Sequence, residues 1–325
     1  MSYEIKVPDI DCKRLVDVSF KFALEKIRNE PIRQEPFPHI YIRDIFPETF
    51  YALLLEHIEN ACQFEASLYP GVAVDVRADN FHDYGLTCKN FGGDPLLAAF
   101  LLEMESGRFS KALIEKFAAP NSWTGKGSAI PKEKFRFTEN EDYNTVFDLH
   151  KDLPGYEITP HPDVASKIVT FLFYFTTDSS IAKHGTALCK PKDPDWVDDR
   201  SVPKSLPLRA LLDRFLINGY GPYQKDAWHP WEDFDIVKVA EAHPNSFLSF
   251  APNFSSYHGV RLDIRKDNPI QERLTLRGFI RAGSNSTNYM HDYGNGIMRR
   301  AFFRFSRFVT GRNKSALNSM RGTHD

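Results

Sequence analysis

A run of nine mostly apolar residues, Lys167 to Phe175 in "KIVTFLFYF", most constrains what this chain can fold into. The run is too short to cross a bilayer as a helix, which needs about 20 apolar residues. Its β-branched and aromatic side chains favour a buried strand. Further short strand-like segments separated by turn signals predict a β-barrel or jelly roll. They are Thr186 to Cys189, Ser246 to Phe250, Gly259 to Ile264 and Arg273 to Arg281.

Residues that precede this strand-rich part have a helical pattern. The stretch His39 to Ile42 alternates like a short strand, and a turn at Phe46-Pro47 follows it. A second helical stretch is expected from Pro95 to Phe117, and the Gly-, Ser- and Pro-rich residues Pro120 to Pro131 predict a loop. The first helix after the turn is expected to place one side inward, formed by Phe50, Leu53, Leu54, His57 and Ile58.

These segments predict a single domain over residues 1–325. Residues 1–134 form N-terminal helical support with short strands, and residues 135–283 form the β core with a long insertion at 190–244. Within the insertion, "KDAWHPWEDFD" is either a lid or a surface excursion. Residues 284–325 predict a basic amphipathic helix, whose Phe face packs on the protein body or forms a homodimer, with a membrane surface as the less favoured alternative.

The composition excludes several classes of partner. The chain has 41 basic and 43 acidic residues, so no overall field attracts nucleic acid or an anionic membrane. Its four cysteines are far apart and form no Cys-x-x-Cys pair, which argues against a disulfide framework or a zinc knuckle. We expect a cytoplasmic protein without a membrane span.

A possible metal site lies directly before the apolar run. Two His and one carboxylate can hold Fe(II) and leave positions open for a co-substrate and O2. His161 and Asp163 are two apart, and residues i and i+2 of an extended segment point to one side. The rival motif, His150 with Asp152, is followed by the turn signal "LPG", and we expect His150 to be a solvated loop residue. The candidate third ligand is His258, which enters a strand after a polar turn.

The stretch "QERLTLRGFIRAG" predicts a strand with a cationic inner face. Arg273, Thr275, Arg277, Phe279 and Arg281 face one way, and Leu274, Leu276 and Ile280 the other. A buried Arg is costly unless a carboxylate meets it. A dicarboxylate co-substrate bound by Arg273, with a hydroxyl donor from Thr275, would supply that carboxylate. An edge strand whose arginines all face water is the alternative.

The motifs "PHPD", "IVTFLFYF", "HGTAL", "SYHGV" and "RLTL" appear in this order between Tyr156 and Arg281. In this respect the chain resembles the Fe(II)- and 2-oxoglutarate-dependent oxygenases, in their prolyl-hydroxylase-like branch. The resemblance implies a mainly β fold with helical support, built on a double-stranded β-helix. It implies iron ligands at His161, Asp163 and His258, and 2-oxoglutarate binding by Arg273, Tyr174, Thr275 and Arg277.

The implied activity is that of a dioxygenase that hydroxylates a small molecule or a peptidyl side chain. Fe(II), 2-oxoglutarate and O2 are the implied cofactors, with ascorbate as a reductant and succinate and CO2 as products. Asp163 favours hydroxylation, because halogenating relatives carry a small residue at that position. The spacing of 95 residues from Asp163 to His258 is a departure, which the insertion explains. The alternative is a jelly-roll or cupin-like binding protein without turnover.

Overall fold

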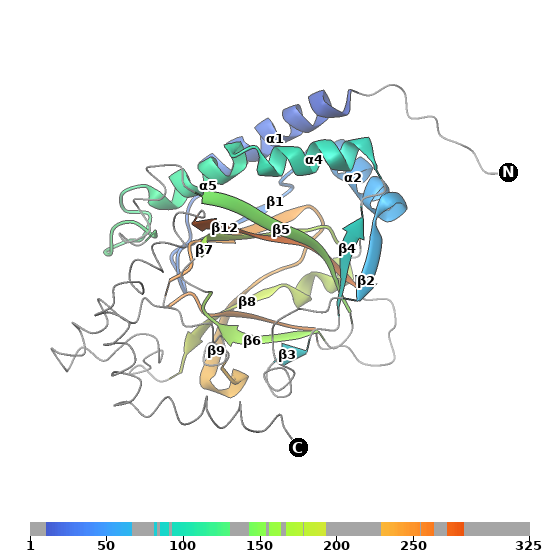
Figure 1. Cartoon of the computed structure of the whole chain (residues 1–325). Helices are drawn as coiled ribbons and strands as arrows, with labels where there is room; N and C mark the ends of the chain where they lie inside the picture. Colours follow the sequence, from blue (N-terminus) through green and yellow to red (C-terminus); the bar gives the residue numbers. More distant parts are fainter. Residues whose placement is uncertain are drawn as a thin grey trace, which may run out of the picture. The chain divides into compact units, whose positions relative to one another are not determined.

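Two antiparallel sheets make up the centre of the protein (Figure 1). A computed structural model describes residues 11–66, 81–82, 85–90, 93–130, 143–153, 156–163, 167–177, 179–192, 229–253, 255–262 and 272–282. The larger sheet has the strand order β1-β10-β7-β12-β5-β4-β2, and the smaller has the order β3-β6-β11-β8-β9. From β5 to β12 consecutive strands alternate between the sheets, except that β8 and β9 both belong to the smaller one. This alternation is the connectivity of a double-stranded β-helix. The predicted fold class is confirmed.

The strands of the larger sheet are β1 (His39–Arg43), β2 (Gln63–Ala66), β4 (Gly85–Asn90), β5 (Tyr143–Asp152), β7 (Lys167–Tyr174), β10 (Ser246–Phe250) and β12 (Arg273–Ala282). Those of the smaller sheet are β3 (Phe81–His82), β6 (Glu157–His161), β8 (Thr186–Pro191), β9 (Phe234–Ala240) and β11 (His258–Arg261). The strand predicted at Ser246 to Phe250 has the observed bounds, and those at Lys167 and Arg273 begin at the predicted residues.

The apolar run in β7 has two buried faces. On the outer face, the Phe171 ring lies 5.0 Å from that of Phe109, and the Phe173 ring lies 5.4 Å from that of Phe46. On the inner face, Tyr174 belongs to a cluster shared with the smaller sheet, formed by Phe37, Tyr41, Leu188, Ala240, Ala242, Leu248 and Phe250. Burial on both faces explains why the run lacks the polar alternation of a half-exposed strand.

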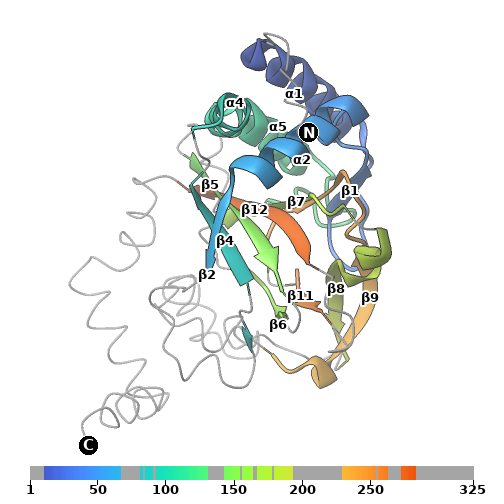
Figure 2. The same cartoon turned by 90° about the vertical axis from the view of Figure 1, so that its right-hand side faces the viewer.

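Helices cover the outer face of the larger sheet (Figure 2). They are α1 (Cys12–Asn29), α2 (Glu48–Ala61), α4 (Pro95–Glu105) and α5 (Arg108–Ala118). The helical stretch predicted from Pro95 to Phe117 is two helices, because Gly107 between them has φ 82°, a left-handed conformation that glycine adopts without strain. The sequence analysis missed α1, although Asp11 caps it and its apolar residues recur at helical spacing.

The predicted insertion at 190–244 is too long at both ends. Strand β8 continues to Pro191, and β9 occupies Phe234–Ala240, paired with β8 in the smaller sheet. Four consecutive residues of β9, from Asp235 to Lys238, are exposed, so the segment lacks the apolar alternation that reveals a half-buried strand.

The residue before β8 is Gly185, where a Cβ would collide with the backbone oxygen of Ala240, so the close approach of the two backbones requires glycine.

Two other predictions concern residues outside the described part of the chain. The C-terminal helix at 284–325 lies there, as do residues 193–228 of the insertion. In the part that is described, no helix combines the length and the apolar character needed to cross a bilayer.

Candidate active site

The two candidate histidine ligands lie side by side on adjacent strands of the smaller sheet. His161 ends β6, and His258 begins β11 directly opposite it. Their ring centroids are 4.5 Å apart. Nδ1 of His161 lies 2.9 Å from the carbonyl oxygen of Thr159, and Nδ1 of His258 lies 2.8 Å from that of Ser256. Each carbonyl fixes the proton on Nδ1, which leaves Nε2 with a lone pair for a metal.

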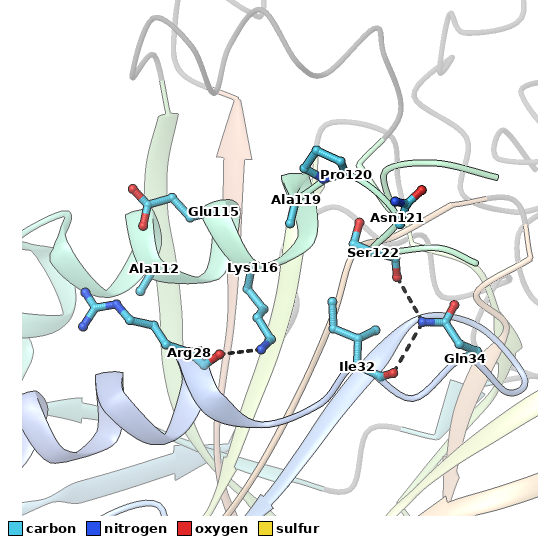
Figure 3. Close-up of a pocket in the computed structure, with 10 residues that line it drawn as sticks. All are labelled: Arg28, Ile32, Gln34, Ala112, Glu115, Lys116, Ala119, Pro120, Asn121 and Ser122. Atoms are coloured by element: carbon cyan, nitrogen blue, oxygen red, sulfur yellow. Dashed lines mark hydrogen bonds between the residues drawn. The ribbon is translucent and has the colours of Figure 1, made fainter. Parts of the chain in front are cut away.

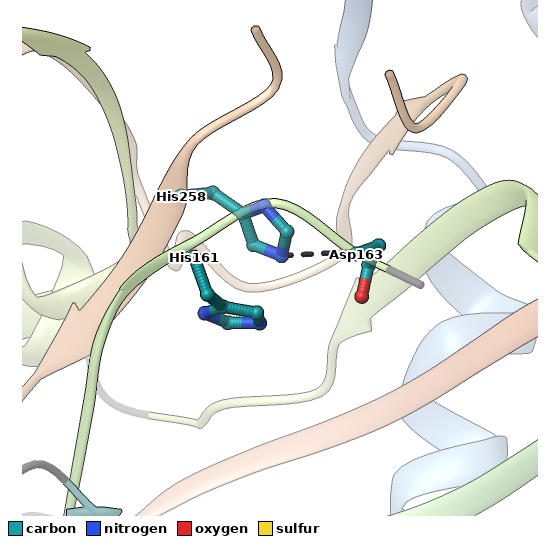
Figure 4. Close-up of side chains that lie close together, drawn as sticks. All are labelled: His161, Asp163 and His258. Atoms are coloured by element: carbon teal, nitrogen blue, oxygen red, sulfur yellow. Dashed lines mark ion pairs between the residues drawn. The ribbon is translucent and has the colours of Figure 1, made fainter. Parts of the chain in front are cut away.

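Asp163 completes the cluster (Figure 4). One ligand atom from each of His161, Asp163 and His258 lies within 4.8 Å of the other two. Lys167 donates to Oδ1 of Asp163 at 2.5 Å, and the Thr170 hydroxyl donates to Oδ2 at 2.5 Å. Both donors come from β7, so the apolar strand fixes the carboxylate beside the histidines.

The electrostatics of the cluster favour the charge states that bind a metal. Burial and the neighbouring His258 lower the pKa of His161 to about 3. Burial also lowers the pKa of His258. Burial opposes ionisation of Asp163, but Lys167 and the two histidines hold its pKa below the usual range. At neutral pH the site therefore has two neutral imidazoles and one carboxylate, the protonation states that metal ligands need.

Arg273 is buried inside the barrel, as predicted for a co-substrate ligand, but it already has a carboxylate partner. Its Nε lies 2.6 Å from Oδ2 of Asp152, as does its Nη2. Its Nη1 donates to the backbone oxygen of His184 at 3.0 Å. These contacts use three of the five N–H groups of a guanidinium and leave one on each terminal nitrogen for a ligand. The carboxylate that compensates Arg273 is therefore supplied by Asp152 of the protein itself, whereas the sequence analysis expected it from a co-substrate.

Thr275 and Tyr174 lie next to Arg273 on the inner face. They face each other across β12 and β7, and both are buried. The Tyr174 hydroxyl is 2.7 Å from that of Thr186 on β8. In the described part of the chain, Oγ1 of Thr275 is buried without a hydrogen-bond partner. An orphaned hydroxyl of this kind is costly, and an oxygen of a bound co-substrate would satisfy it.

The guanidinium of Arg277 is largely occupied by contacts within the protein. Its Nε donates to Oδ1 of Asp148 at 2.8 Å and its Nη2 to Oδ2 at 3.2 Å, while Nη1 donates to the Tyr156 hydroxyl at 2.9 Å. Nδ1 of His150 lies 3.3 Å from Nη2 of the same arginine. A role for Arg277 in binding the co-substrate directly thus has less support than roles for Arg273 and Thr275.

The expectation that His150 is a solvated loop residue is wrong. His150 belongs to β5 and is 0% exposed, with Nε2 3.3 Å from Oδ1 of Asp152. Burial, followed by Arg277 and Arg273, lowers its pKa to about 2. The turn signal after His150 is real, because the amide of Tyr156 donates to the carbonyl of Leu153 at 3.0 Å, but the strand extends up to that turn.

Sequence reasoning did not identify Asp148 and Thr170, and it named Asp152 only as part of the rival motif and Lys167 only as the start of the apolar run. Only the register of β5, which places Asp152 opposite Arg273 and Asp148 opposite Arg277, explains the roles of the two acids. Lys167 and Thr170 gave no signal, because the side-chain pattern of a strand does not indicate a contact with the preceding Asp163.

A hollow of about 530 Å³ lies elsewhere, at the ends of α1 and α5 (Figure 3). Its polar groups bond to one another: Lys116 donates to the Arg28 carbonyl at 2.7 Å, and Gln34 donates to the carbonyls of Ser122 and Ile32. The hollow adjoins neither the histidine cluster nor Arg273, and its lining offers no metal-binding group of residues.

Several solved structures resemble this chain. A prolyl-4-hydroxylase from Pseudomonas putida is 11% identical with a TM-score of 0.36, over 80% of this chain and 96% of that one. HygX from Streptomyces hygroscopicus, solved with nickel and 2-oxoglutarate bound, is 12% identical with a TM-score of 0.37, over 76% and 83%. An oxidoreductase of the 2OG-Fe(II) oxygenase family from Burkholderia pseudomallei is 9% identical with a TM-score of 0.32, over 80% and 89%.

No family model matches the sequence, and no curated protein matches it significantly. The similar structures include the class of oxygenase that the motifs resemble, but identities and TM-scores this low carry no conclusion about activity. The strand order alone defines the class of protein, a double-stranded β-helix. The activity of this particular chain has to be inferred from its own side chains.

Proposed function

We propose that the protein is an Fe(II)- and 2-oxoglutarate-dependent dioxygenase that hydroxylates an organic substrate. The observation that carries the proposal is the convergence of His161, Asp163 and His258, with both Nδ1 atoms tied to backbone carbonyls. Two imidazoles and one carboxylate form the donor set that holds Fe(II) on one face and leaves the other face open.

The residues of the chain fit both absent groups. Nε2 of His161 and His258 and an oxygen of Asp163 would hold the metal. The free N–H groups of Arg273, the Thr275 hydroxyl and the Tyr174 phenol would hold the distal carboxylate of 2-oxoglutarate. When bound together, iron and 2-oxoglutarate supply the oxidation by O2 that releases succinate and CO2 and hydroxylates the substrate.

The chain's own contribution is binding, orientation and the exclusion of water. Lys167 and Thr170 hold Asp163 in place. Phe250 packs its ring 4.7 Å from that of His258, which places an apolar wall beside the metal ligands. Such a wall keeps solvent from the reacting groups.

The test is succinate formation by the full chain with Fe(II), 2-oxoglutarate and ascorbate, with and without candidate substrates. We expect slow succinate release from the wild type and none from His161→Ala. Arg273→Met should raise the 2-oxoglutarate concentration needed for half-maximal rate by roughly 30-fold or more, because a charged hydrogen-bond donor is lost. Its metal affinity should be unchanged. A wild type that binds metal but never forms succinate contradicts the proposal.

One observation favours the alternative, a binding protein without turnover. Asp152 already neutralises Arg273, so the charge balance of the interior does not require a bound dicarboxylate. Calorimetry with the metal-loaded protein separates the two functions. A dioxygenase binds 2-oxoglutarate only with the metal present, whereas failure to bind it under any condition would support the binding protein.

A further inference from the structure

Three arginines lie four residues apart on the inner face of β12: Arg273, Arg277 and Arg281. Side chains directly opposite each other on antiparallel strands share a face of the sheet. The residues of β5 opposite these arginines are, in the same order, Asp152, Asp148 and Asn144. The series of acidic partners therefore stops at the third position.

The first two arginines use the same edge of the guanidinium. Nε and Nη2 of Arg273 both contact Asp152 at 2.6 Å. Nε and Nη2 of Arg277 contact the two oxygens of Asp148 at 2.8 and 3.2 Å. In Arg281 the corresponding Nε is buried and, in the described part of the chain, has no hydrogen-bond partner. Burying a charged donor without an acceptor is costly, so this edge is suited to a carboxylate that the protein does not supply.

Arg281 also lies close to the metal ligands. Its guanidinium is 5.6 Å from the centroid of the Phe279 ring, and the ammonium of Lys167 is 3.3 Å from the same centroid. Lys167 in turn binds Asp163 at 2.5 Å. In the register of β12 and β7, Arg281 is directly opposite Lys167. A group bound to Arg281 would thus be a short distance from the candidate metal centre.

The inner face of β5 becomes more exposed towards Arg281. Along the inner face of β5, Asp152 is 2% exposed, Val146 is 40% exposed, and Asn144 is exposed as well. A ligand can therefore reach Arg281 from solvent without passing the buried Arg273. The neutral Asn144 supplies no counter-charge to Arg281, unlike the acids opposite the other two arginines.

Among the described residues of the inner face, one positive charge remains without an acidic partner. Lys167 is paired with Asp163, Arg277 with Asp148 and Arg273 with Asp152. The charges of Fe(II) and of the 2-oxoglutarate dianion would cancel each other. We propose that Arg281 binds a carboxylate group of the substrate through its Nε edge, so that the substrate is a carboxylic acid. The identification of the ligand at Arg281 as the substrate rests on the proposed function.

The test uses two probes that differ only in charge, N-acetylglycine and N-acetylglycinamide. Each is titrated by calorimetry at low ionic strength into the protein loaded with Zn(II) and 2-oxoglutarate, and into the metal-free protein. We expect the wild type to bind the acid about tenfold or more tightly than the amide, since hydrogen bonds to charged groups are the strong ones. Arg281→Met should abolish the preference.

A second variant tests the same site without removing the arginine. Asn144→Asp restores the missing acid opposite Arg281, at an exposed position that tolerates the change, and should also abolish the preference. Arg14→Met, at an exposed residue of α1, is the matched control and should retain it. Equal binding of the two probes to the wild type, no binding of the acid, or a preference that survives both variants overturns the inference.

The experiment also separates this inference from the proposed function. Binding of Zn(II) and 2-oxoglutarate is measured in the same series. If the wild type binds neither of them but still prefers the acid through Arg281, the carboxylate site stands and the oxygenase proposal is contradicted. If Zn(II) and 2-oxoglutarate both bind and the acid binds no more tightly than the amide, the oxygenase proposal stands and the carboxylate site is contradicted.

Discussion

At the scale of single residues, the two candidate histidine ligands share one local device. Each donates from Nδ1 to the carbonyl of the residue two positions earlier, Thr159 for His161 and Ser256 for His258. The backbone thereby sets the tautomer and the ring orientation without help from another side chain. Such supporting contacts are commonly as important to a metal site as the ligands themselves.

Removing a ligand should abolish metal binding while the fold persists. His161→Ala or His258→Ala should weaken Co(II) binding by more than about 100-fold, since the loss of an outer-shell contact alone costs about 10- to 100-fold. Titration followed by the visible absorption of Co(II) measures the affinity, and circular dichroism checks the fold. Wild-type affinity in either variant would remove the proposed centre.

His150 belongs to a different network, which includes Arg273, the proposed ligand of the co-substrate. It lies 3.3 Å from both Arg277 and Asp152, and Asp152 holds Arg273. We expect His150→Ala to leave Co(II) affinity within about twofold of wild type and to weaken 2-oxoglutarate binding by roughly tenfold, because an unsatisfied buried group costs about 1–3 kcal/mol. Calorimetry measures both affinities. A larger effect on the metal would show that the rival motif is the metal site.

At the scale of secondary-structure elements, β7 serves two purposes. Its outer face packs on the helices, and its first residues hold the carboxylate of Asp163 through Lys167 and Thr170. The ammonium of Lys167 occupies a buried position, with its side chain 12% exposed. A buried carboxylate without a cation nearby is strongly destabilising, so Lys167 stabilises the protein when no metal is bound.

This role predicts a metal-dependent effect of Lys167→Met. Without metal, the free energy of unfolding should fall by about 3 kcal/mol, because Asp163 loses its partner. Saturating Zn(II) should restore most of the loss, since the metal supplies the missing positive charge. Urea unfolding with and without Zn(II) measures both values, and the exposed Lys238→Met on β9 is the control. An equal loss in both conditions would contradict this role.

At the scale of the whole molecule, buried neutral histidines tie stability to pH. Burial lowers the pKa of His39 to about 4, that of His150 to about 2 and that of His161 to about 3. All three values lie below 6.5, the ordinary value for histidine. As the pH falls below 6.5, the unfolded chain therefore takes up protons before the folded protein does.

The free energy of unfolding of the metal-free protein should consequently fall as the pH is lowered from 7 to 5. Each of these histidines adds up to about 1.4 kcal/mol per pH unit below the unfolded pKa, so the expected loss for the three over about 1.5 pH units is roughly 6 kcal/mol. Urea unfolding at several pH values gives the slope. His39→Gln, at a residue outside the candidate site, should make the slope shallower, and a flat profile for the wild type would refute this account.

The sequence by itself determined the elements whose side-chain pattern fits only one kind of environment. The apolar run of β7 and the alternation of β12 have a single low-energy arrangement, so their strands could be located. His161, Asp163 and His258 could be grouped because their neighbours mark rigid strands. Strands β5 and β9 could not be found in this way, since one has a polar inner face and the other is largely exposed.

Only the tertiary structure decided which charges meet. Asp152 and Arg273 are 121 residues apart in the sequence, and their ion pair follows from the register of β5 against β12. The same register places Asn144, and not an acid, opposite Arg281. Electrostatic contacts inside a barrel depend on distances of a few ångströms between strands, and sequence spacing does not contain these distances.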